Sequence, residues 1–406
     1  MRARFQSDLV RDRLRAIRSI VREVVLERRI VFVEARDGKL SFSTRSGIAI
    51  GEVRFNADDT KIVIVEEGAA ALDANEFLSS IDRAADEVVE IASGPDRDCI
   101  RFAATEYAFP RACVASLPLR VSLSLPKVAY SDYDRVSVSS SESSVVRFAF
   151  ELEGIFARTV FASKARAQSE SRFVLFRSGE SGLIVFSTDE KRYAIVRSRV
   201  DADAEAKAKV LAYLDYDSAA LAHSFLDSSD ERVEVGVDTN GWLVLAGESF
   251  TVGLATLSMP LPANRIDYLG IDRKFRARVH RAATVPYESF ARAYRSIEPV
   301  VSKEWRTIGF EFGESSITLS ATSDLGVSAK SRIDFESIVP ANLRTTIYLD
   351  SKYVGDFLAA VRSVVSAEAL ESTKIVFERK EDSKGIVFLG IESDDWRYGM
   401  MPISRD

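Results

Sequence analysis

The sequence predicts an α+β fold in which one module is repeated three times, with helices on one face of antiparallel sheets. A hairpin-like pattern occurs three times, and a Leu-Asp pair followed by a helical pattern also occurs three times. The spacings between the two features are 29, 27 and 28 residues, measured from Thr44 to Asp73, from Thr188 to Asp215 and from Thr322 to Asp350. Chance similarity of β-rich sequence does not readily place both features in register three times.

Chain length and composition agree with several soluble domains. The 406 residues exceed one ordinary core and suit two to four domains. Hydrophobic residues make up 46% of the chain and charged residues 29%, which is typical of globular proteins. We expect no transmembrane helix, since no apolar run of about 18 residues occurs. The N-terminus lacks an apolar signal core, so we expect a cytoplasmic protein.

The two cysteines, Cys99 and Cys113, are expected to be reduced thiols. A disulfide between them is the alternative that the sequence leaves open.

Each module is predicted to contain a β-hairpin that follows a turn signal with glycine. The signals are Asp37-Gly38, Ser181-Gly182 and the Gly313 turn. The first strands are predicted at residues 39–44, 183–188 and 316–322. The second strands are predicted at residues 48–55, 193–200 and 327–333.

Two helices and two further strands complete each module. The opening helices are predicted at residues 7–24, 152–164 and 286–297. The second helices, each capped by the Asp of the Leu-Asp pair, are predicted at residues 76–83, 218–226 and 353–364. Asp73 with Glu76 also fits a capping box. The last strand pairs are predicted at residues 87–92 and 99–104, 232–237 and 242–246, and 374–378 and 385–391.

The predicted domains span residues 1–125, 146–268 and 273–406. Residues 126–145 are rich in Ser and Asp without hydrophobic periodicity, which predicts a linker or long loop. The proline-containing stretch at residues 259–264 marks the second boundary.

The first helix carries an arginine stripe beside its apolar stripe. The apolar residues are Val10, Leu14, Ile17, Val21 and Val24. The arginine stripe, which follows each of the first four by one residue, is Arg11, Arg15, Arg18 and Arg22. A solvated helix face is the ordinary interpretation of such a stripe, but an all-arginine stripe also suits sequence-independent phosphate contacts.

Other predicted helices also carry basic side chains. They are Arg158, Lys164, Arg166, Arg292, Arg295, Lys352 and Arg362. The net charge of −6 by itself argues against a nucleic-acid partner, but the distribution of charge decides what DNA meets.

No catalytic or metal motif is recognisable. His223 lies among apolar residues on a predicted helix, and His280 lies between two arginines. Neither has other metal-ligating side chains at a suitable spacing in the sequence. Phosphate-cradling glycine loops, nucleophile elbows and Cys-x-x-Cys pairs do not occur. We therefore expect a protein that is not an enzyme and needs no cofactor. A hydrolase or transferase on this fold would need a convergent polar pocket.

The chain resembles the bacterial DNA polymerase III β subunit, the DNA sliding clamp, as a divergent member. The threefold module order matches, and residues 187–194 (STDEKRYA) resemble the family motif ATDGHRLA. Residues 398–403 (YGMMPI) resemble the family ending YVVMPM. Residues 353–358 (YVGDFL) resemble the start of the family's last helix.

The resemblance implies a ring-forming, head-to-tail homodimer around double-stranded DNA that increases polymerase processivity. It implies one peptide cleft per protomer for DNA polymerase, the clamp loader and repair proteins. By resemblance, the cleft residues are Leu175, Thr188, Lys191, Arg192, Tyr193, Pro262, Met400, Met401, Pro402 and Ile403. By resemblance and by the stripe, the DNA-binding residues are Arg11, Arg15, Arg18, Arg22, Arg28, Arg29, Arg172 and Phe173.

Two departures from the family bear on the cleft. Glu190 and Lys191 replace a Gly and a His of the motif, which makes the predicted rim bulkier and more charged. The chain also ends in Ser404-Arg405-Asp406 in place of a shorter ending. A clamp-fold paralogue that regulates or sequesters partners, outside replication, is the alternative function.

Overall fold

The computed structural model describes most of the chain. The described residues are 1–22, 29–57, 61–84, 87–93, 97–102, 105–110, 145–164, 172–179, 182–198, 211–226, 229–237, 241–257, 279–335, 346–380, 387–391 and 396–403. Residues 126–144, Arg28, Arg166, Cys113, Pro262 and Ser404-Arg405-Asp406 lie outside them.

The chain folds into two compact units, and each contains segments that are distant in sequence. Unit 1 comprises Met1–Glu153, Ser178–Glu180 and Asp201–Leu257. Unit 2 comprises Gly154–Arg177, Ser181–Val200 and Ser258–Asp406.

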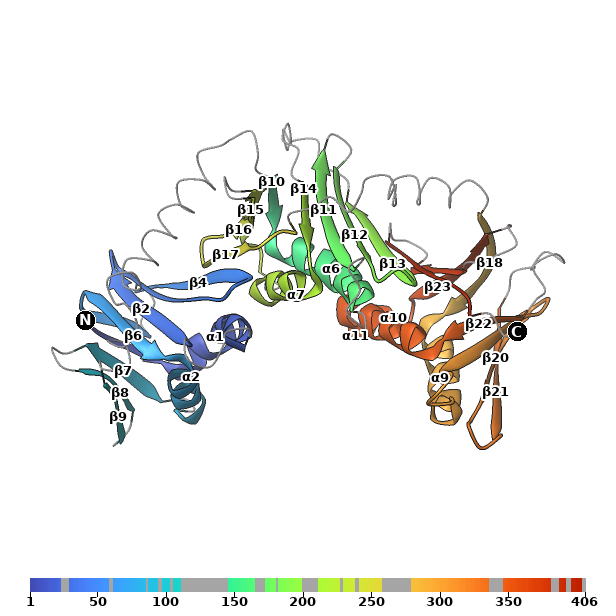
Figure 1. Ribbon diagram of the computed structural model, residues 1–406, viewed down its shortest axis with the longest axis horizontal. Helices are drawn as coiled ribbons and strands as arrows, with labels where there is room; N and C mark the ends of the chain where they lie inside the picture. Colours follow the sequence, from blue (N-terminus) through green and yellow to red (C-terminus); the bar gives the residue numbers. More distant parts are fainter. Residues whose placement is uncertain are drawn as a thin grey trace. The chain divides into compact units, whose positions relative to one another are not determined.

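Unit 1 is built from strands and three complete helices among its described residues (Figure 1). Its strands are β1 (Arg2–Gln6), β2 (Ile30–Arg36), β3 (Lys39–Arg45), β4 (Ala49–Asn56), β5 (Ile62–Glu66), β6 (Gly68–Asp73), β7 (Val88–Ser93), β8 (Arg97–Phe102), β9 (Thr105–Pro110), β10 (Val145–Phe148), β14 (Leu211–Leu214), β15 (Arg232–Val237), β16 (Leu243–Ala246) and β17 (Phe250–Leu254). The helices are α1 (Ser7–Arg22), α2 (Ala74–Arg83) and α7 (Tyr216–Phe225). Helix α6 (Ala149–Thr159) begins in this unit.

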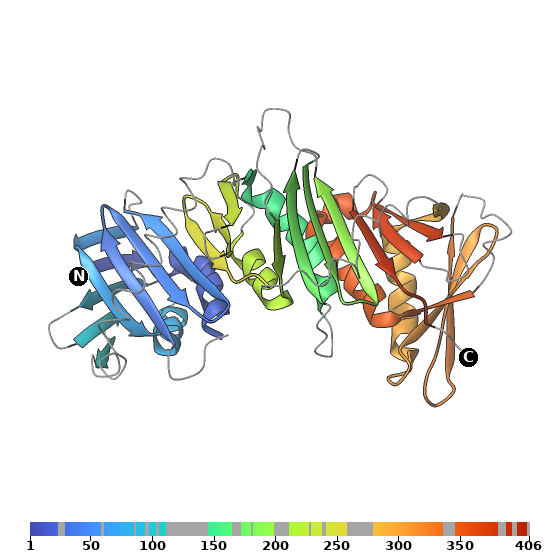
Figure 2. The ribbon, with the colours of Figure 1, turned by 45° about the horizontal axis from the view of Figure 1, so that its top comes forward.

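Two sheets organise unit 1. One has the strand order β5-β1-β7-β8-β9, and the other has the order β10-β15-β16-β17-β4-β3-β2-β6. The hairpin from β2 to β3 turns at Asp37-Gly38, and both residues have positive φ, as a tight hairpin turn requires. Figure 2 turns these strands toward the viewer.

The helices of unit 1 pack on the sheet through apolar faces. Helix α1 packs against both α2 and α7 (Figure 1). Gly51 on β4 permits this contact, because a Cβ there would overlap Phe225 of α7 and Ile20 of α1. Phe42 anchors the core beneath α2, with its ring 5.7 Å from Phe77.

Unit 2 has the same kinds of element. Its strands are β11 (Phe173–Gly179), β12 (Gly182–Thr188), β13 (Arg192–Ser198), β18 (Val279–Pro286), β19 (Thr307–Phe312), β20 (Ser316–Thr322), β21 (Ser328–Asp334), β22 (Thr346–Asp350), β23 (Lys374–Lys380), β24 (Val387–Ile391) and β25 (Trp396–Met400). The helices are η2 (Val160–Ser163), α9 (Tyr287–Ile297), η3 (Glu298–Val300), α10 (Ser351–Val364) and α11 (Ala367–Leu370).

One sheet of unit 2 runs in the order β11-β12-β13-β25-β24-β23-β18, and the other in the order β21-β20-β19-β22. The second sheet repeats the β4-β3-β2-β6 order of unit 1, with the same chain succession within it. Aromatic rings fill the core, and Phe290 lies 5.1 Å from Phe377.

The predicted α+β fold of helices and antiparallel sheets is confirmed. The three predicted hairpins form, as β3–β4, β12–β13 and β20–β21. The three predicted aspartate caps also form, because Asp73, Asp215 and Asp350 accept hydrogen bonds from the first turns of α2, α7 and α10. The domain boundaries stay a prediction.

Candidate functional site

The apolar stripe of α1 is buried and its arginine stripe borders solvent. Val10, Leu14, Ile17 and Val21 are at most 2% exposed, as predicted. Val24 lies outside the described residues. Arg15 and Arg22 are exposed, whereas Arg11 and Arg18 are half-buried.

The stripe arginines differ in their partners. Arg18 donates hydrogen bonds to the Asp82 carboxylate at 2.6 Å and to the Leu78 carbonyl at 3.3 Å. Arg15 pairs with Asp12 at 3.1 Å, but both side chains are about three-quarters exposed, so this ion pair contributes little. Arg11 donates to the Ser7 hydroxyl at 3.4 Å.

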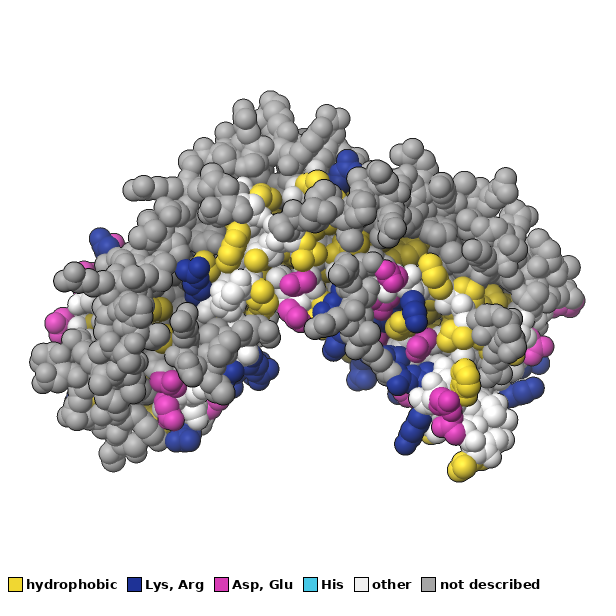
Figure 3. Space-filling model, viewed as in Figure 1, with side chains coloured by type: hydrophobic (Ala, Val, Ile, Leu, Met, Phe, Trp, Pro, Cys, Tyr) yellow, Lys and Arg dark blue, Asp and Glu magenta, His cyan; other side chains and the backbone are white. Residues whose placement is uncertain are grey.

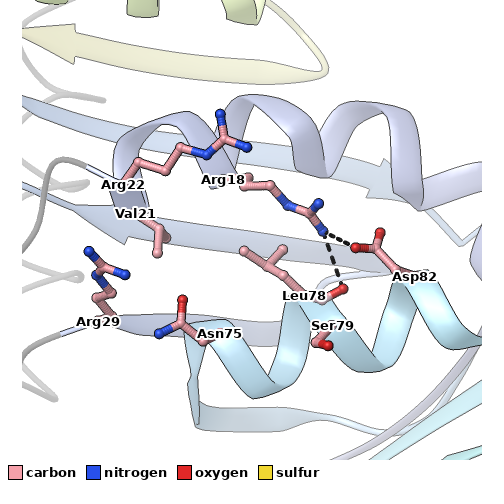
Figure 4. Close-up of a pocket in the computed structure, with 8 residues that line it drawn as sticks. All are labelled: Arg18, Val21, Arg22, Arg29, Asn75, Leu78, Ser79 and Asp82. Atoms are coloured by element: carbon pink, nitrogen blue, oxygen red, sulfur yellow. Dashed lines mark hydrogen bonds and ion pairs between the residues drawn. The ribbon is translucent and has the colours of Figure 1, made fainter. Parts of the chain in front are cut away.

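A cleft of about 330 Å³ lies between α1 and α2 (Figure 4). It is lined by Arg18, Val21, Arg22, Arg29, Asn75, Leu78, Ser79 and Asp82. Figure 4 places Arg22 and Arg29 at the end away from the Arg18–Asp82 pair. The Arg29 guanidinium lies on the same side of the cleft as the Asn75 amide, and guanidinium groups suit phosphate oxygens. The space-filling view shows dark blue basic side chains where Figure 1 draws α1 (Figure 3).

The other predicted DNA residues lie in different settings. Arg172 is half-buried just before β11. Phe173 is fully buried, with its ring 6.1 Å from Phe186, so it belongs to the core and we leave it out of the DNA-binding set. Arg28 lies outside the described residues. Among the additional basic residues, Arg292, Arg295 and Arg362 are exposed.

The predicted partner cleft begins at the turn between β12 and β13. Asp189 holds this turn, because its Oδ1 accepts hydrogen bonds from the backbone N–H groups of Lys191 (3.1 Å) and Arg192 (3.0 Å). The Thr188 hydroxyl donates to the Arg192 carbonyl at 2.7 Å. Glu190 adopts φ 75°, a conformation that glycine accepts more readily than glutamate.

Arg192 is buried within unit 2, where it connects neighbouring elements, and does not line an open surface. Its side chain is 0% exposed. It donates to Asp189 Oδ2 at 3.0 Å, to Asp356 Oδ2 at 2.6 Å and to the Lys164 carbonyl at 3.0 Å. Its guanidinium also lies 4.2 Å from the Tyr353 ring centroid. These contacts tie the β12–β13 turn to α10.

Burial and neighbouring charges shift the pKa values of Arg192 and of the tyrosines around it. Burial lowers the pKa of Arg192, but Tyr398, Asp356 and Asp189 outweigh burial and raise that pKa above its ordinary value. Burial raises the pKa of Tyr353 to about 12, with Asp189 adding to the effect and Arg192 opposing it. Burial likewise raises the pKa of Tyr398, with Arg192 opposing it.

The C-terminal end of β25 continues into a short strap, defined as residues 401–403. The Met401 N–H donates to the Lys191 carbonyl at 2.9 Å, and the Ile403 N–H donates to the Tyr348 carbonyl at 2.8 Å. Met401 is 53% exposed, whereas Met400 is fully buried. The strap therefore presents Met401 beside the turn, with Pro402 and Ile403 half-buried.

The remaining predicted cleft residues divide between core and surface. Leu175 and Thr188 are buried, at 5% and 6% exposure. Lys191 is exposed, and Tyr193 is half-buried with its ring stacked 5.6 Å from Phe186. Pro262 lies outside the described residues.

Sequence reasoning missed the partners of the buried arginine. Asp189 and Asp356 stood inside two motifs already recognised, so a search for a carboxylate partner within those motifs would have found both. Asp82, which pairs with Arg18, comes from a helix 64 residues later and gave no local signal.

No group of three metal-ligating side chains occurs in the part of the chain that the structure describes. In the same part, no helix is long and apolar enough to cross a membrane. Burial lowers the pKa of His223 on α7, although the Glu153 carboxylate opposes this.

No protein-family model and no curated protein matches the sequence. Solved structures do match over 100% of both chains. They include the DNA polymerase sliding clamps of Bacillus subtilis (16% identity, TM-score 0.75) and Pseudomonas aeruginosa (14%, 0.73). A putative DNA polymerase III β subunit from Eubacterium rectale matches at 15% identity and TM-score 0.70. This chain therefore has the fold of the bacterial DNA polymerase III β sliding clamps, at a sequence identity that marks it as divergent.

Proposed function

We propose that the protein is a DNA sliding clamp, a non-catalytic processivity factor that encircles duplex DNA as a head-to-tail homodimer. The observation that carries this proposal is a repeated strand pairing that, in the part of the chain that the structure describes, leaves β9 and β21 as a complementary pair of open edges. The full-length likeness to structures described as sliding clamps supports it.

The pairing occurs once within each unit. In unit 1, β17 pairs antiparallel with β4, and Leu254 at the end of β17 lies opposite Ala49 at the start of β4. In unit 2, β25 pairs antiparallel with β13, and Met400 lies opposite Arg192 in the same way. Each joint pairs the last strand of a four-stranded run, β10-β15-β16-β17 or β18-β23-β24-β25, with the second strand of a hairpin.

Among the described residues, a third joint of this kind has no partner strand within one chain. Strand β9 ends one sheet of unit 1, and β21 ends one sheet of unit 2. They correspond to β17 and β4 in the order of their sheets. The same register would place Pro110 of one copy opposite Ser328 of a second copy. Two such joints close a ring from two chains.

Backbone N–H groups of β21 are oriented to form this joint. The Phe335 N–H donates to the Ser315 carbonyl of the β20 side, so alternate residues point the same way along the strand. The N–H groups of Lys330 and Arg332 therefore point away from β20. Both side chains are exposed.

The test of ring closure uses Lys330→Pro, which removes one outward N–H and leaves the β20–β21 hydrogen bonds in place. The matched control is Lys330→Ala, which keeps the N–H. Light scattering should give a dimer mass for the wild type and the control, and a monomer mass for the proline variant at equal concentration. A dimer of unchanged stability in the proline variant would exclude β21 as the joint.

The proposed partners follow from this function. The arginine stripe of α1, with Arg22 and Arg29 at the cleft, would contact phosphates without reading sequence. The turn and strap near Met401 would hold peptides from DNA polymerase, the clamp loader and repair proteins. We place the protein in the cytoplasm and keep the three-module division as part of the proposal.

A clamp-fold paralogue that only sequesters partners is the second candidate, and the divergence of the sequence favours keeping it. Changing Arg11, Arg15, Arg18 and Arg22 to Glu separates the two. Retention on loaded circular DNA should be abolished in a sliding clamp. Unchanged retention would show that the arginine stripe does not contact DNA. A wild type that neither stays on loaded circular DNA nor stimulates a polymerase would favour the paralogue.

A further inference from the structure

The turn-and-strap arrangement at Met401 has a counterpart inside unit 1. There the turn between β3 and β4 meets residues 255–257, which continue from β17 and which we call the second strap. The Ala255 N–H donates to the Ile48 carbonyl at 2.8 Å, and the Leu257 N–H donates to the Tyr213 carbonyl at 2.7 Å. The first strap makes the same two bonds, to Lys191 and Tyr348.

The two turns are held in the same way. The Ser46 hydroxyl oxygen accepts hydrogen bonds from the N–H groups of Ile48 (3.3 Å) and Ala49 (3.0 Å). Asp189 plays that part in the other turn. The two turn-and-strap arrangements therefore share a side chain that fixes the turn. They also share the strand pairing, of β17 with β4 and of β25 with β13. Strands β4 and β17 lie side by side (Figure 1).

The second strap presents apolar side chains to solvent. Leu257 is 39% exposed and Leu211 is 51% exposed. Leu211 lies two residues before Tyr213 on β14, so both side chains point to the same face of that strand. Ile48 at the turn is half-buried.

Charge distinguishes the two surfaces. The turn and strap of unit 2 expose Glu190 and Lys191, whose charges cancel. Among residues 44–50, 211–213 and 255–257 of unit 1, the charged side chain is Arg45, and it is exposed. A ligand for this surface should therefore combine apolar side chains with a carboxylate.

We propose that the Arg45, Ile48, Leu211 and Leu257 surface is a second peptide-docking site, which takes an extended acidic peptide segment of a partner protein with Leu or Phe side chains. Backbone groups at a strand end and pockets for alternate side chains are the usual features of such recognition. This inference rests on the proposed function, because the first strap is itself a proposed peptide site. The ring would then carry two kinds of docking site with different charge preference.

The test measures how many peptides bind each chain, using the intact protein and a fluorescein-labelled heptapeptide library with alternating Leu or Phe and one or two Asp. Fluorescence anisotropy should give two equivalents per chain for the wild type. Leu257→Asp should abolish binding at the second strap and leave one equivalent, bound at the first strap. Met401→Asp should abolish binding at the first strap and leave one equivalent, bound at the second strap. Val63→Asp, at a side chain 51% exposed on β5, is the matched control and should keep both.

Arg45→Glu in the Met401→Asp background tests the charge preference. The affinity of the remaining site should fall by about tenfold or more, as expected when a strong interface residue is removed. Loss of all binding in Met401→Asp alone would overturn the second site and leave the proposed function intact. Absence of any binding by a wild type that forms rings would overturn both peptide sites. A change of oligomeric mass in Leu257→Asp would instead assign this face to a contact between copies.

Discussion

Single buried residues can fix the position of a whole turn, and Arg192 is an example. It binds two carboxylates, a backbone carbonyl and an aromatic face while fully buried. Removing one partner of such a buried arrangement costs about 3–5 kcal/mol, because the other charges are left without their counter-charge. The residue therefore shapes the proposed cleft by fixing the turn that bears Lys191, without contacting a ligand itself.

Glu190 offers a stabilising substitution at the same turn. Its φ of 75° costs a non-glycine residue about 1–2 kcal/mol, whereas glycine loses about 0.5–1 kcal/mol through entropy. Glu190→Gly should therefore raise the free energy of unfolding by about 0.5–1 kcal/mol, measured from urea midpoints. The neighbouring Lys191→Gly is the control and should lower it. A midpoint that falls in Glu190→Gly would show that the glutamate side chain stabilises the turn.

Tyr353 predicts a loss of stability at alkaline pH. Burial raises its pKa to about 12 from an ordinary value near 10, so the folded state favours the neutral phenol. Its contribution to stability is complete below pH 10 and disappears as the pH rises through 12. Urea midpoints of Tyr353→Phe should fall less between pH 9 and pH 12 than those of the wild type. Equal falls in both proteins would assign the loss to other tyrosines.

At the scale of elements, close helix packing depends on glycine. A Cβ at Gly355 of α10 would lie 2.6 Å from the Tyr294 hydroxyl of α9, which itself donates to the Ser351 carbonyl at 2.9 Å. The two helices can approach this closely only because position 355 has no side chain.

Gly355→Ala should destabilise unit 2 by about 1–3 kcal/mol, since overpacking forces α10 away from α9. The matched control is Gly154→Ala in α6, where a Cβ would meet only Arg158 at 3.9 Å. That change should be neutral or stabilising by up to about 1 kcal/mol, because alanine favours helices. Calorimetric midpoints distinguish the two. Equal effects would show that the α9–α10 contact adapts freely.

The elements show which features the sequence could predict. Hairpins and aspartate-capped helices have local signals, such as Asp37-Gly38 and Asp73, and these formed where predicted. The joints of β17 with β4 and of β25 with β13 have no local signal, because they pair strands about 200 residues apart. Arg192 and Phe173 were predicted at functional surfaces but are buried, since their neighbours come from distant segments.

For the whole molecule, the proposed DNA contact requires that the arginine stripe of α1 outweigh a net charge of −6. Local charge can do this, because counterion release depends on the cations that contact phosphates and not on the total. Arg22 is exposed at the cleft, whereas Arg18 is already engaged by Asp82.

The salt dependence of DNA binding follows from this difference. Arg22→Gln should reduce the slope of log affinity against log salt by about 1 for each phosphate that the arginine neutralises. Arg18→Gln should change the slope less. Filter binding or anisotropy with duplex DNA at several salt concentrations measures both. Equal reductions would show that the Arg18–Asp82 pair opens when DNA binds.

The unequal edges β9 and β21 also bear on solubility. An unpaired edge strand is a template for pairing with another chain, and a contact between two unlike edges either closes on itself or continues without limit. In the proposed ring both edges are occupied. A variant whose curvature prevents closure would keep one of each exposed and grow into filaments, so closure of the proposed ring also protects the protein from aggregation.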